Sequence, residues 1–423
     1  MAGERRLTFD SVPKNLDNNI NFSPDGRFLV FDCRDKGGIN TNRRLGMVEV
    51  ATGKVTIFYT QKPPALGVGA ASFLSERSVV AIHALTSGLT YDFTVRGGMI
   101  IATDGSGAIR WLDSRDVLPP FTPGALRGGT HKHEPDESGV WVGFTYNDHI
   151  MKSLGSDLRN VGVSKRGITV TVSDEPKGRN FTGESFSVLL TECRDKPEPG
   201  SDEYRRAEGD CWVGRHGYPT SSGPVRARAF RGTVVVIEDG AEKAYGDVFV
   251  VDVPDDITVA GPSGPLQGTE RTYPSPPKGA RVRRLTRTAE DADVRLRGVS
   301  GHLRADGAGR WVAFIGKAEI AGKVTAQVFV VSPATGEVRR LSSLPMGVIG
   351  DPRFSADGSY VAVACPDGSV HAISARESDW GRARQAAPAG EAMPHNIVIS
   401  PNSGTIAYNR TVGGLQQIFV CEA

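Results

Sequence analysis

Three of the eight histidines in this 423-residue chain lie close together, between Arg127 and Met151. His131 and His133 are separated by one residue, and His149 follows a run of residues typical of a β-strand. An imidazole titrates near neutral pH, so a pair of histidines suits acid–base chemistry, and neutral imidazoles also bind transition metals. Either chemistry requires that the surrounding strands bring these side chains together.

The composition limits the classes of protein to which the chain can belong. The net charge of +2, from 50 basic and 48 acidic residues, gives no electrostatic case for nucleic acid or a membrane surface. No apolar run is as long as a membrane span, and the N-terminus shows no signal peptide. We therefore expect a cytoplasmic protein, or a secreted or periplasmic one whose signal was removed. The five cysteines have no CxxC spacing, which predicts separate thiols.

A weak repeat runs along the chain and predicts its fold. Its clearest copy, NINFSPDGRFLVFD (19–32), reads as a strand, a Ser-Pro-Asp-Gly turn and a second strand. Segments such as LGMVEVATGKVTIFYT (45–60) add a third and a fourth strand. Units of four short antiparallel strands, repeated every 40 or more residues, indicate an all-β, seven-bladed β-propeller.

The two ends of the chain predict how the propeller closes. The last copy supplies three strands and ends in QQIFVCEA, whereas the N-terminal RRLTFD resembles fourth strands elsewhere in the chain. We expect the N-terminal strand to complete the last blade, which leaves no open sheet edge. The chain is then a single propeller domain, 1–423, with an irregular functional insertion at 176–224.

Blade topology brings two of the histidines towards one face. His131 is expected at the start of a first strand and His149 at the end of the antiparallel second strand, so both should lie at the mouth of the channel. His133 shares a side of the strand with His131 but lies deeper. Tyr146 and Asn147, just before His149, are expected to contact a substrate.

Other histidines fall into two groups. His302 and His395 precede first strands of other blades, so they could join the same mouth as substrate contacts or as metal ligands. For His83, His216 and His371 we expect ordinary structural roles. A divalent metal such as zinc, manganese or calcium is therefore conceivable, with ligands that the sequence does not identify.

The insertion carries aromatic and basic residues that suit a binding wall. Tyr204, Trp212 and Tyr218 lie among glycines and charged residues, and insertions of this kind often carry function. Arg226 and Arg228 follow on one side of a strand, where a guanidinium could pair with a carboxylate. A solvated loop is the plainer interpretation of the charged part of this segment.

Several long blocks resemble a known group of proteins. LRGGTHKHEPDESGVWVGFTYNDH, DLRNVGV, PEPGSDEYRRAEGDCWVG and RARAFRG are similar to a bacterial family of uncharacterised seven-bladed propellers, which is itself similar to ulvan lyase type polysaccharide lyases. A more distant likeness is to oligogalacturonate lyases, which use a metal held by histidines. Family membership does not by itself establish an activity.

The resemblance implies β-elimination next to a uronic acid. Such lyases use two histidines, a tyrosine and an arginine, which match His131, His149, Tyr218 (with Tyr204 second) and Arg226 (with Arg228 second). The arginine would neutralise the sugar carboxylate, and the tyrosine and a histidine would transfer protons. Residues 133, 146, 147, 204, 212, 228, 302 and 395 would bind substrate. This mechanism needs no cofactor.

Three functional hypotheses follow from these patterns. The first is a monomeric lyase that cleaves uronate-containing, ulvan-like glycans, with an anionic glycan as its partner. The second is a non-catalytic propeller that binds glycans or proteins. The third is a metal-dependent hydrolase or an oligogalacturonate-type lyase. Formation of an unsaturated product and sensitivity to chelators separate the three.

Overall fold

A computed structural model describes residues 3–17, 20–35, 38–64, 66–290 and 296–423. The chain forms two compact units. The first unit comprises Asp10–Asp195 and Val253–Arg281, and the second comprises Met1–Phe9, Lys196–Asp252 and Val282–Ala423. The expectation of a single domain stays a prediction. No helix in the described ranges is long and apolar enough to cross a membrane.

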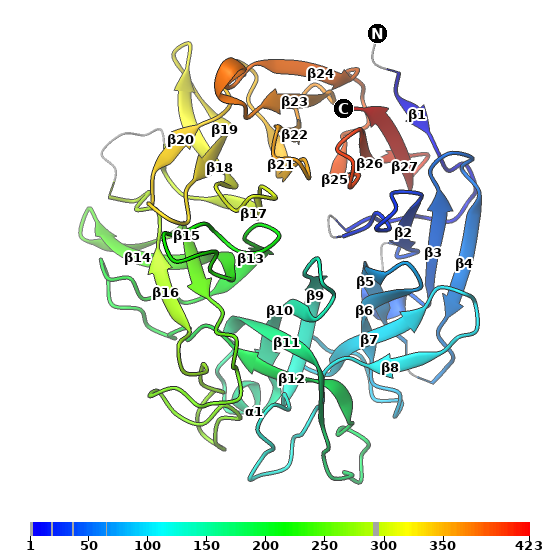
Figure 1. Ribbon diagram of the computed structural model, residues 1–423, viewed down its shortest axis with the longest axis vertical. Helices are drawn as coiled ribbons and strands as arrows, with labels where there is room; N and C mark the ends of the chain where they lie inside the picture. Colours follow the sequence, from blue (N-terminus) through cyan, green and yellow to red (C-terminus); the bar gives the residue numbers. More distant parts are fainter. Residues whose placement is uncertain (1–2, 18–19, 36–37, 65, 291–295) are drawn as a thin grey trace. The chain divides into compact units, whose positions relative to one another are not determined.

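The first unit contains three antiparallel sheets, called blades 1 to 3 in chain order (Figure 1). Each sheet follows the order of its strands along the chain, which is the pattern of a propeller blade. The strands of blade 1 are β2 (Phe28–Asp32), β3 (Arg44–Glu49) and β4 (Val55–Thr60); of blade 2, β5 (Val68–Ser75), β6 (Ser78–Ala84), β7 (Arg96–Ala102) and β8 (Ile109–Trp111); of blade 3, β9 (Gly128–Pro135), β10 (Trp141–Asp148), β11 (Arg159–Val170) and β12 (Gly183–Leu189). The helical segments are η1 (Ile39–Thr41) and α1 (His149–Ser153).

The second unit contains four further sheets, blades 4 to 7, with the same strand order. Their strands are β13 (Ala207–Trp212), β14 (Ala227–Glu238), β15 (Ala241–Asp252) and β16 (Arg281–Arg284) in blade 4; β17 (Ser300–Ala305), β18 (Val312–Ile320), β19 (Lys323–Val331) and β20 (Val338–Arg340) in blade 5; β21 (Ile349–Phe354), β22 (Tyr360–Ala364), β23 (Val370–Ser374) and β24 (Ala383–Ala387) in blade 6; β25 (His395–Ile399), β26 (Thr405–Val412) and β27 (Leu415–Glu422) in blade 7. A 3₁₀ turn, η3 (Glu377–Asp379), precedes β24.

The N-terminal strand β1 (Arg5–Arg6) pairs with β27, so that Arg5 lies opposite Val420. The first strand of the chain therefore completes blade 7, as the terminal sequences predict. The seven sheets and the near absence of helix confirm the predicted fold class, an all-β, seven-bladed β-propeller.

The core lies where neighbouring sheets face one another. In the first unit, Leu45 and Phe58 of blade 1 share a buried cluster with Phe73 and Met99 of blade 2. Alternate residues of each strand point to opposite faces of the sheet, which is why these strands combine apolar and polar positions in alternation. All five cysteines are buried thiols that form no disulfide, as the spacing predicts.

The segment expected to be irregular, 176–224, is more regular than its sequence indicates. It contains β12, the fourth strand of blade 3, and β13, the first strand of blade 4. The prediction of an irregular segment is corrected here. Glycine, proline and charged residues on either side of β12 and β13 made these two short strands difficult to recognise in the sequence. Between β15 and β16, the stretch 253–280 contains no strand, and the sequence did not predict this long irregular connection.

The first strand of six blades is interrupted by a β-bulge at an equivalent place. In each of them, two or three residues oppose a single residue of the second strand. One residue of each bulge has a positive φ: Ala70, Lys132, Gly209, Gly301, Gly350 and Asn396. A bulge redirects the side chains around it, and bulges are frequent beside active sites. Several polar residues of the first strands, among them His302 and Asp351, lie within these bulges.

Candidate functional site

His131 and His149 both belong to blade 3, at different heights in the sheet. Gly128 at the start of β9 lies opposite Asp148 at the end of β10, so these two strand ends do meet as the topology requires. His131, however, lies three residues inside β9, opposite Thr145. The three residue steps from Thr145 to Asp148 span about 10 Å. The pair therefore does not share one end of the blade.

The short helix α1 fixes His149 beyond the end of β10. Asp148 is its N-cap and accepts a hydrogen bond from the backbone N–H of Met151, 2.8 Å away. The same carboxylate forms a buried ion pair with Arg127, 2.8 Å apart. The Nδ1 atom of His149 lies 3.2 Å from the hydroxyl of Thr94. Burial, followed by Arg115 and Arg179, lowers the pKa of His149.

Three cationic side chains act electrostatically on the His131 imidazole. Its side chain is half-buried, and burial lowers its pKa well below the usual value. The charges of Arg96, Arg159 and Lys132 lower it further. The imidazole is therefore neutral at pH 7 and able to accept a proton. The positive surroundings favour an anionic ligand beside it.

Arg96 holds a tyrosine in the same neighbourhood. Arg96 begins β7 and is 5% exposed, and its Nη1 donates to the hydroxyl of Tyr91 over 2.6 Å. Its buried Nε has no hydrogen-bond partner among the residues that the structure describes. Gly67, with φ +128°, lies under the Tyr91 ring, where a Cβ atom would approach the ring to 2.5 Å. The backbone of Gly67 thus makes room for the phenol.

Arg159 is oriented by an amide of the neighbouring strand. Its Nε donates to the side-chain oxygen of Asn147 at 3.1 Å, and the amide nitrogen of Asn147 donates to Asp157 at 2.8 Å. Asn147 itself is buried. It therefore acts by positioning Arg159, and its expected direct contact with substrate is corrected.

His133 supports this region from inside the blade. It is fully buried, and its Nε2 lies 2.9 Å from the hydroxyl of Thr130. Burial, with a contribution from Arg96, lowers the pKa of His133 to about 3. The bulge at Lys132 separates its surroundings from those of His131. A neutral, enclosed imidazole of this kind does not contact a substrate, which corrects that expectation.

Three other expected contact residues belong to the core. Tyr146 is fully buried and donates to Asp148 at 2.9 Å. Tyr204 packs against Phe230 and Phe249, with ring centroids 5.3 and 5.0 Å away. Arg228 is fully enclosed, paired with Asp210, and lies 4.7 Å from the ring centroid of Trp212. None of the three side chains Tyr146, Tyr204 and Arg228 can meet a substrate, and half-buried Trp212 is covered by the guanidinium.

Tyr218 and Arg226 occupy one hairpin between β13 and β14. Tyr218 pairs with Val225, which places Arg226 beside Gly217. The Tyr218 hydroxyl donates to Asp252 at 2.9 Å, and its ring belongs to a buried cluster. Burial, then Asp252, raises its pKa. The hairpin joins strands one and two of blade 4, whereas His149 follows strand two of blade 3. The grouping of Tyr218 and Arg226 with His131 and His149 in one catalytic quartet stays a prediction.

His302 and His395 lie at bulges in blades 5 and 7. The Nδ1 atom of His302 is 2.5 Å from Oδ2 of Asp351, and the other carboxylate oxygen, Oδ1, accepts the His302 backbone N–H at 2.8 Å. Burial alone would raise the pKa of Asp351, but the bonds to His302 hold it well below its usual value. His395 is half-buried, and burial lowers its pKa.

The donor set does not fit a preformed metal site. No three His, Cys, Asp or Glu side chains gather within the described ranges. One nitrogen of His302 is already engaged by Asp351. No step of the chemistry below is therefore assigned to a metal.

Tyr91, Arg96 and Arg159 are the residues that sequence reasoning missed. Tyr91 lies in the loop between β6 and β7, Arg96 is the first residue of β7, and Arg159 begins β11. The signal was available in the strand order, because the end of β6 and the start of β7 lie at the blade end where β9 and β11 also begin.

Comparison with known proteins extends these observations. A family model described as "protein of unknown function (DUF3748)" matches residues 66–181, which include blade 2, the first three strands of blade 3 and the His131 region. An oligogalacturonate lyase in complex with manganese has a TM-score of 0.57 at 12% identity, over 100% of this chain and 93% of that one. The oligogalacturonate lyase of Vibrio parahaemolyticus gives 0.56 at 10% identity, over 100% and 97%. These likenesses show a shared fold.

One relative has a higher sequence identity than these two lyases. The chain is 35% identical over 348 residues to the Escherichia coli K12 protein named "Uncharacterized protein YidR", which covers 80% of this chain and 79% of that protein. Identity of this extent shows common descent over most of both chains, and this chain belongs to the family of YidR.

Proposed function

We propose that the protein is a lyase that cleaves uronate-containing oligo- or polysaccharides by β-elimination. The observation that carries the proposal is the neutral imidazole of His131 among Arg96, Arg159 and Lys132. A uronate presents a carboxylate next to the carbon whose proton must be removed. A base beside several cations suits that substrate, because the cations neutralise the carboxylate and so acidify the C5–H bond.

Each residue of the site has a role in this reaction. Arg96 and Arg159 receive the carboxylate. His131 takes the proton from C5, for which a neutral imidazole is competent. Tyr91 accepts a hydrogen bond from Arg96, so its own O–H is available to protonate the oxygen that leaves C4. The C4–O bond breaks as the C4–C5 double bond forms, and the proton gained by His131 then returns to the Tyr91 phenolate, directly or through solvent, to restore both groups.

The identity of the glycan is a finer part of the proposal. The sequence blocks favour an ulvan-like substrate, and the fold of the oligogalacturonate lyases favours a galacturonate oligomer. Both carry the carboxylate that the arginines require. Purified protein should be incubated with ulvan, polygalacturonate and oligogalacturonates, with dextran as the neutral control.

Appearance of ultraviolet absorbance from the conjugated unsaturated uronate supports the lyase. Release of reducing ends without that absorbance would instead indicate a hydrolase, and binding without turnover would indicate a non-catalytic propeller. Parallel reactions with EDTA, with and without added manganese, test whether the activity needs a divalent metal. Loss of activity that only metal restores would refute the metal-free assignment of roles.

A further inference from the structure

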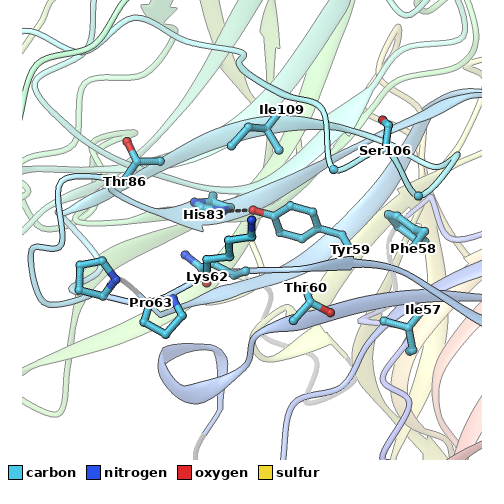
Figure 2. A pocket seen from close by; sticks show the side chains of 14 residues that line it. Ile57, Phe58, Tyr59, Thr60, Lys62, Pro63, His83, Thr86, Ser106 and Ile109 are labelled. Atoms are coloured by element: carbon cyan, nitrogen blue, oxygen red, sulfur yellow. Dashed lines mark hydrogen bonds between the residues drawn. The ribbon is translucent and has the colours of Figure 1, made fainter.

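A second polar groove lies in the first unit, away from His131. It has a volume of about 670 Å³ and runs between β4 of blade 1 and the β7–β8 turn of blade 2 (Figure 2). Residues 57–64 form one side, and His83, Thr86 and Ile109 belong to the other. None of Tyr91, Arg96, His131 and Arg159 lines it.

The groove contains a tyrosine–histidine pair with a fixed proton arrangement. The Nδ1 atom of His83 lies 2.6 Å from the carbonyl oxygen of Ala84, which can only accept, so Nδ1 carries the proton. Nε2 is then unprotonated and accepts the hydroxyl proton of Tyr59 over 2.8 Å. Burial lowers the pKa of His83 to about 4, consistent with this neutral form. The Tyr59 oxygen keeps its lone pairs for a donor from a ligand.

Gln61 adds an unused donor. Its side chain is 3% exposed and lines the groove, and its carbonyl oxygen accepts the backbone N–H of Gly67 at 2.9 Å. That bond fixes the orientation of the amide. Its Nε2 has no hydrogen-bond partner among the described residues. A buried amide donor left without a partner costs roughly 1–3 kcal/mol, so a ligand acceptor at this point is favoured.

Lys62 supplies the charge. Its side chain is exposed and extends towards Tyr59 and His83 in the view of Figure 2. It forms no ion pair with any residue in the described part of the chain, and no Asp or Glu lines the groove. The groove thus offers a cation, an amide donor and a phenol oxygen, together with apolar side chains that include Ile57 on one side and Ile109 on the other.

We propose that this groove is a second binding site, distinct from the site around His131, for one acidic sugar residue of a glycan chain. Lys62 and Gln61 receive the carboxylate, and the Tyr59 oxygen accepts a hydroxyl of the sugar. The apolar lining side chains contact the C–H groups of the ring. The choice of an acidic glycan rests on the proposed function; the geometry of the groove does not.

Trp111 provides a local reporter for this site. Its ring makes an edge-on contact with His83, with centroids 6.0 Å apart. The full-length protein is labelled with 5-fluorotryptophan, and the Trp111 resonance is assigned from a Trp111→Phe variant. Titration with trigalacturonate should shift this signal to saturation, whereas maltotriose, a neutral trimer, should leave it unchanged.

Matched lysine variants test the assignment. Lys62→Gln should weaken the dissociation constant read from Trp111 by roughly tenfold, about 1.4 kcal/mol. Lys54→Gln removes the same charge from an exposed lysine between β3 and β4, outside the groove. This control should change the dissociation constant less than about twofold. Tyr59→Phe should weaken binding as well, with the fold checked by circular dichroism.

The outcomes separate this proposal from the lyase. A Trp111 shift without any unsaturated product supports the groove and refutes the lyase. Product without a Trp111 shift supports the lyase and overturns the groove. Equal shifts with maltotriose, or equal affinities for Lys62→Gln and Lys54→Gln, would also overturn it.

Discussion

His131 and His302 both lie at bulges of first strands, yet their surroundings are opposite. His131 is surrounded by Arg96, Arg159 and Lys132, whereas His302 binds the carboxylate of Asp351 at 2.5 Å. A carboxylate partner favours the protonated imidazole, and neighbouring cations favour the neutral one. The same kind of backbone bulge therefore places one histidine near cations in blade 3 and another against a carboxylate in blade 5. The charges around the bulge, more than the histidine itself, indicate function.

Exchange of each histidine for glutamine tests this comparison most strongly. His131→Gln should lower kcat/KM on the uronate substrate by roughly 10²–10⁴, because a general base is lost. His302→Gln should leave it within about threefold, since its partner is an internal carboxylate. Initial rates of product absorbance measure both. Equal losses, or a fully active His131→Gln, would contradict the assignment of the base.

Replacement of Arg96 by lysine tests the cationic side of the same comparison. Arg96→Lys keeps the charge but loses the planar group that holds Tyr91, so kcat/KM should fall by roughly tenfold to a hundredfold. Arg110→Lys is the matched control on the neighbouring strand β8, where the arginine is exposed and paired with Glu184 at 2.9 Å. If kcat/KM falls equally in both variants, the proposed role of Arg96 in carboxylate binding is contradicted.

The sequence predicted the sheets far better than the site. Strand periodicity and Ser-Pro-Asp-Gly turns are local, so the blades and the pairing of β1 with β27 followed from them. The site depends on side chains from separate strands and on bulges, which change the alternation that sequence arguments assume. Arg228 and Tyr204 have the chemistry of binding residues, but tertiary packing buries them. The sequence around Arg96 and Tyr91 contains no motif that predicts their position near His131.

Acid should destabilise the protein through histidines without a carboxylate partner. The pKa of His83 is lowered to about 4, so below pH 6.5 the unfolded chain binds a proton that the folded chain does not. Stability therefore falls as the pH drops from 6.5 towards 4, by about 2 kcal/mol at pH 5. Asp351 acts differently, because its pKa is lowered in the folded protein. Its ionised form stabilises the fold at neutral pH, and this contribution is lost only when the pH falls below the usual pKa of an aspartate.

Urea unfolding at pH 7 and pH 5 measures this contribution of His83. The difference between the two pH values should be smaller by about 2 kcal/mol in His83→Gln than in the wild type. His216→Gln, an exchange at an exposed histidine of the second unit, should keep the wild-type difference. An unchanged pH dependence in His83→Gln would mean that His83 is protonated in the folded protein.

The smallest expected effect concerns His302 and returns to the comparison of the two bulges. His302→Ala removes one bond to Asp351 and leaves the bond from its own backbone N–H, so the free energy of unfolding should fall by only about 1 kcal/mol. The KM for a uronate substrate should not change. A raised KM with unaltered stability would restore His302 to the substrate-binding role that its sequence position suggests. In that case cations around the imidazole would no longer distinguish a functional bulge from a structural one.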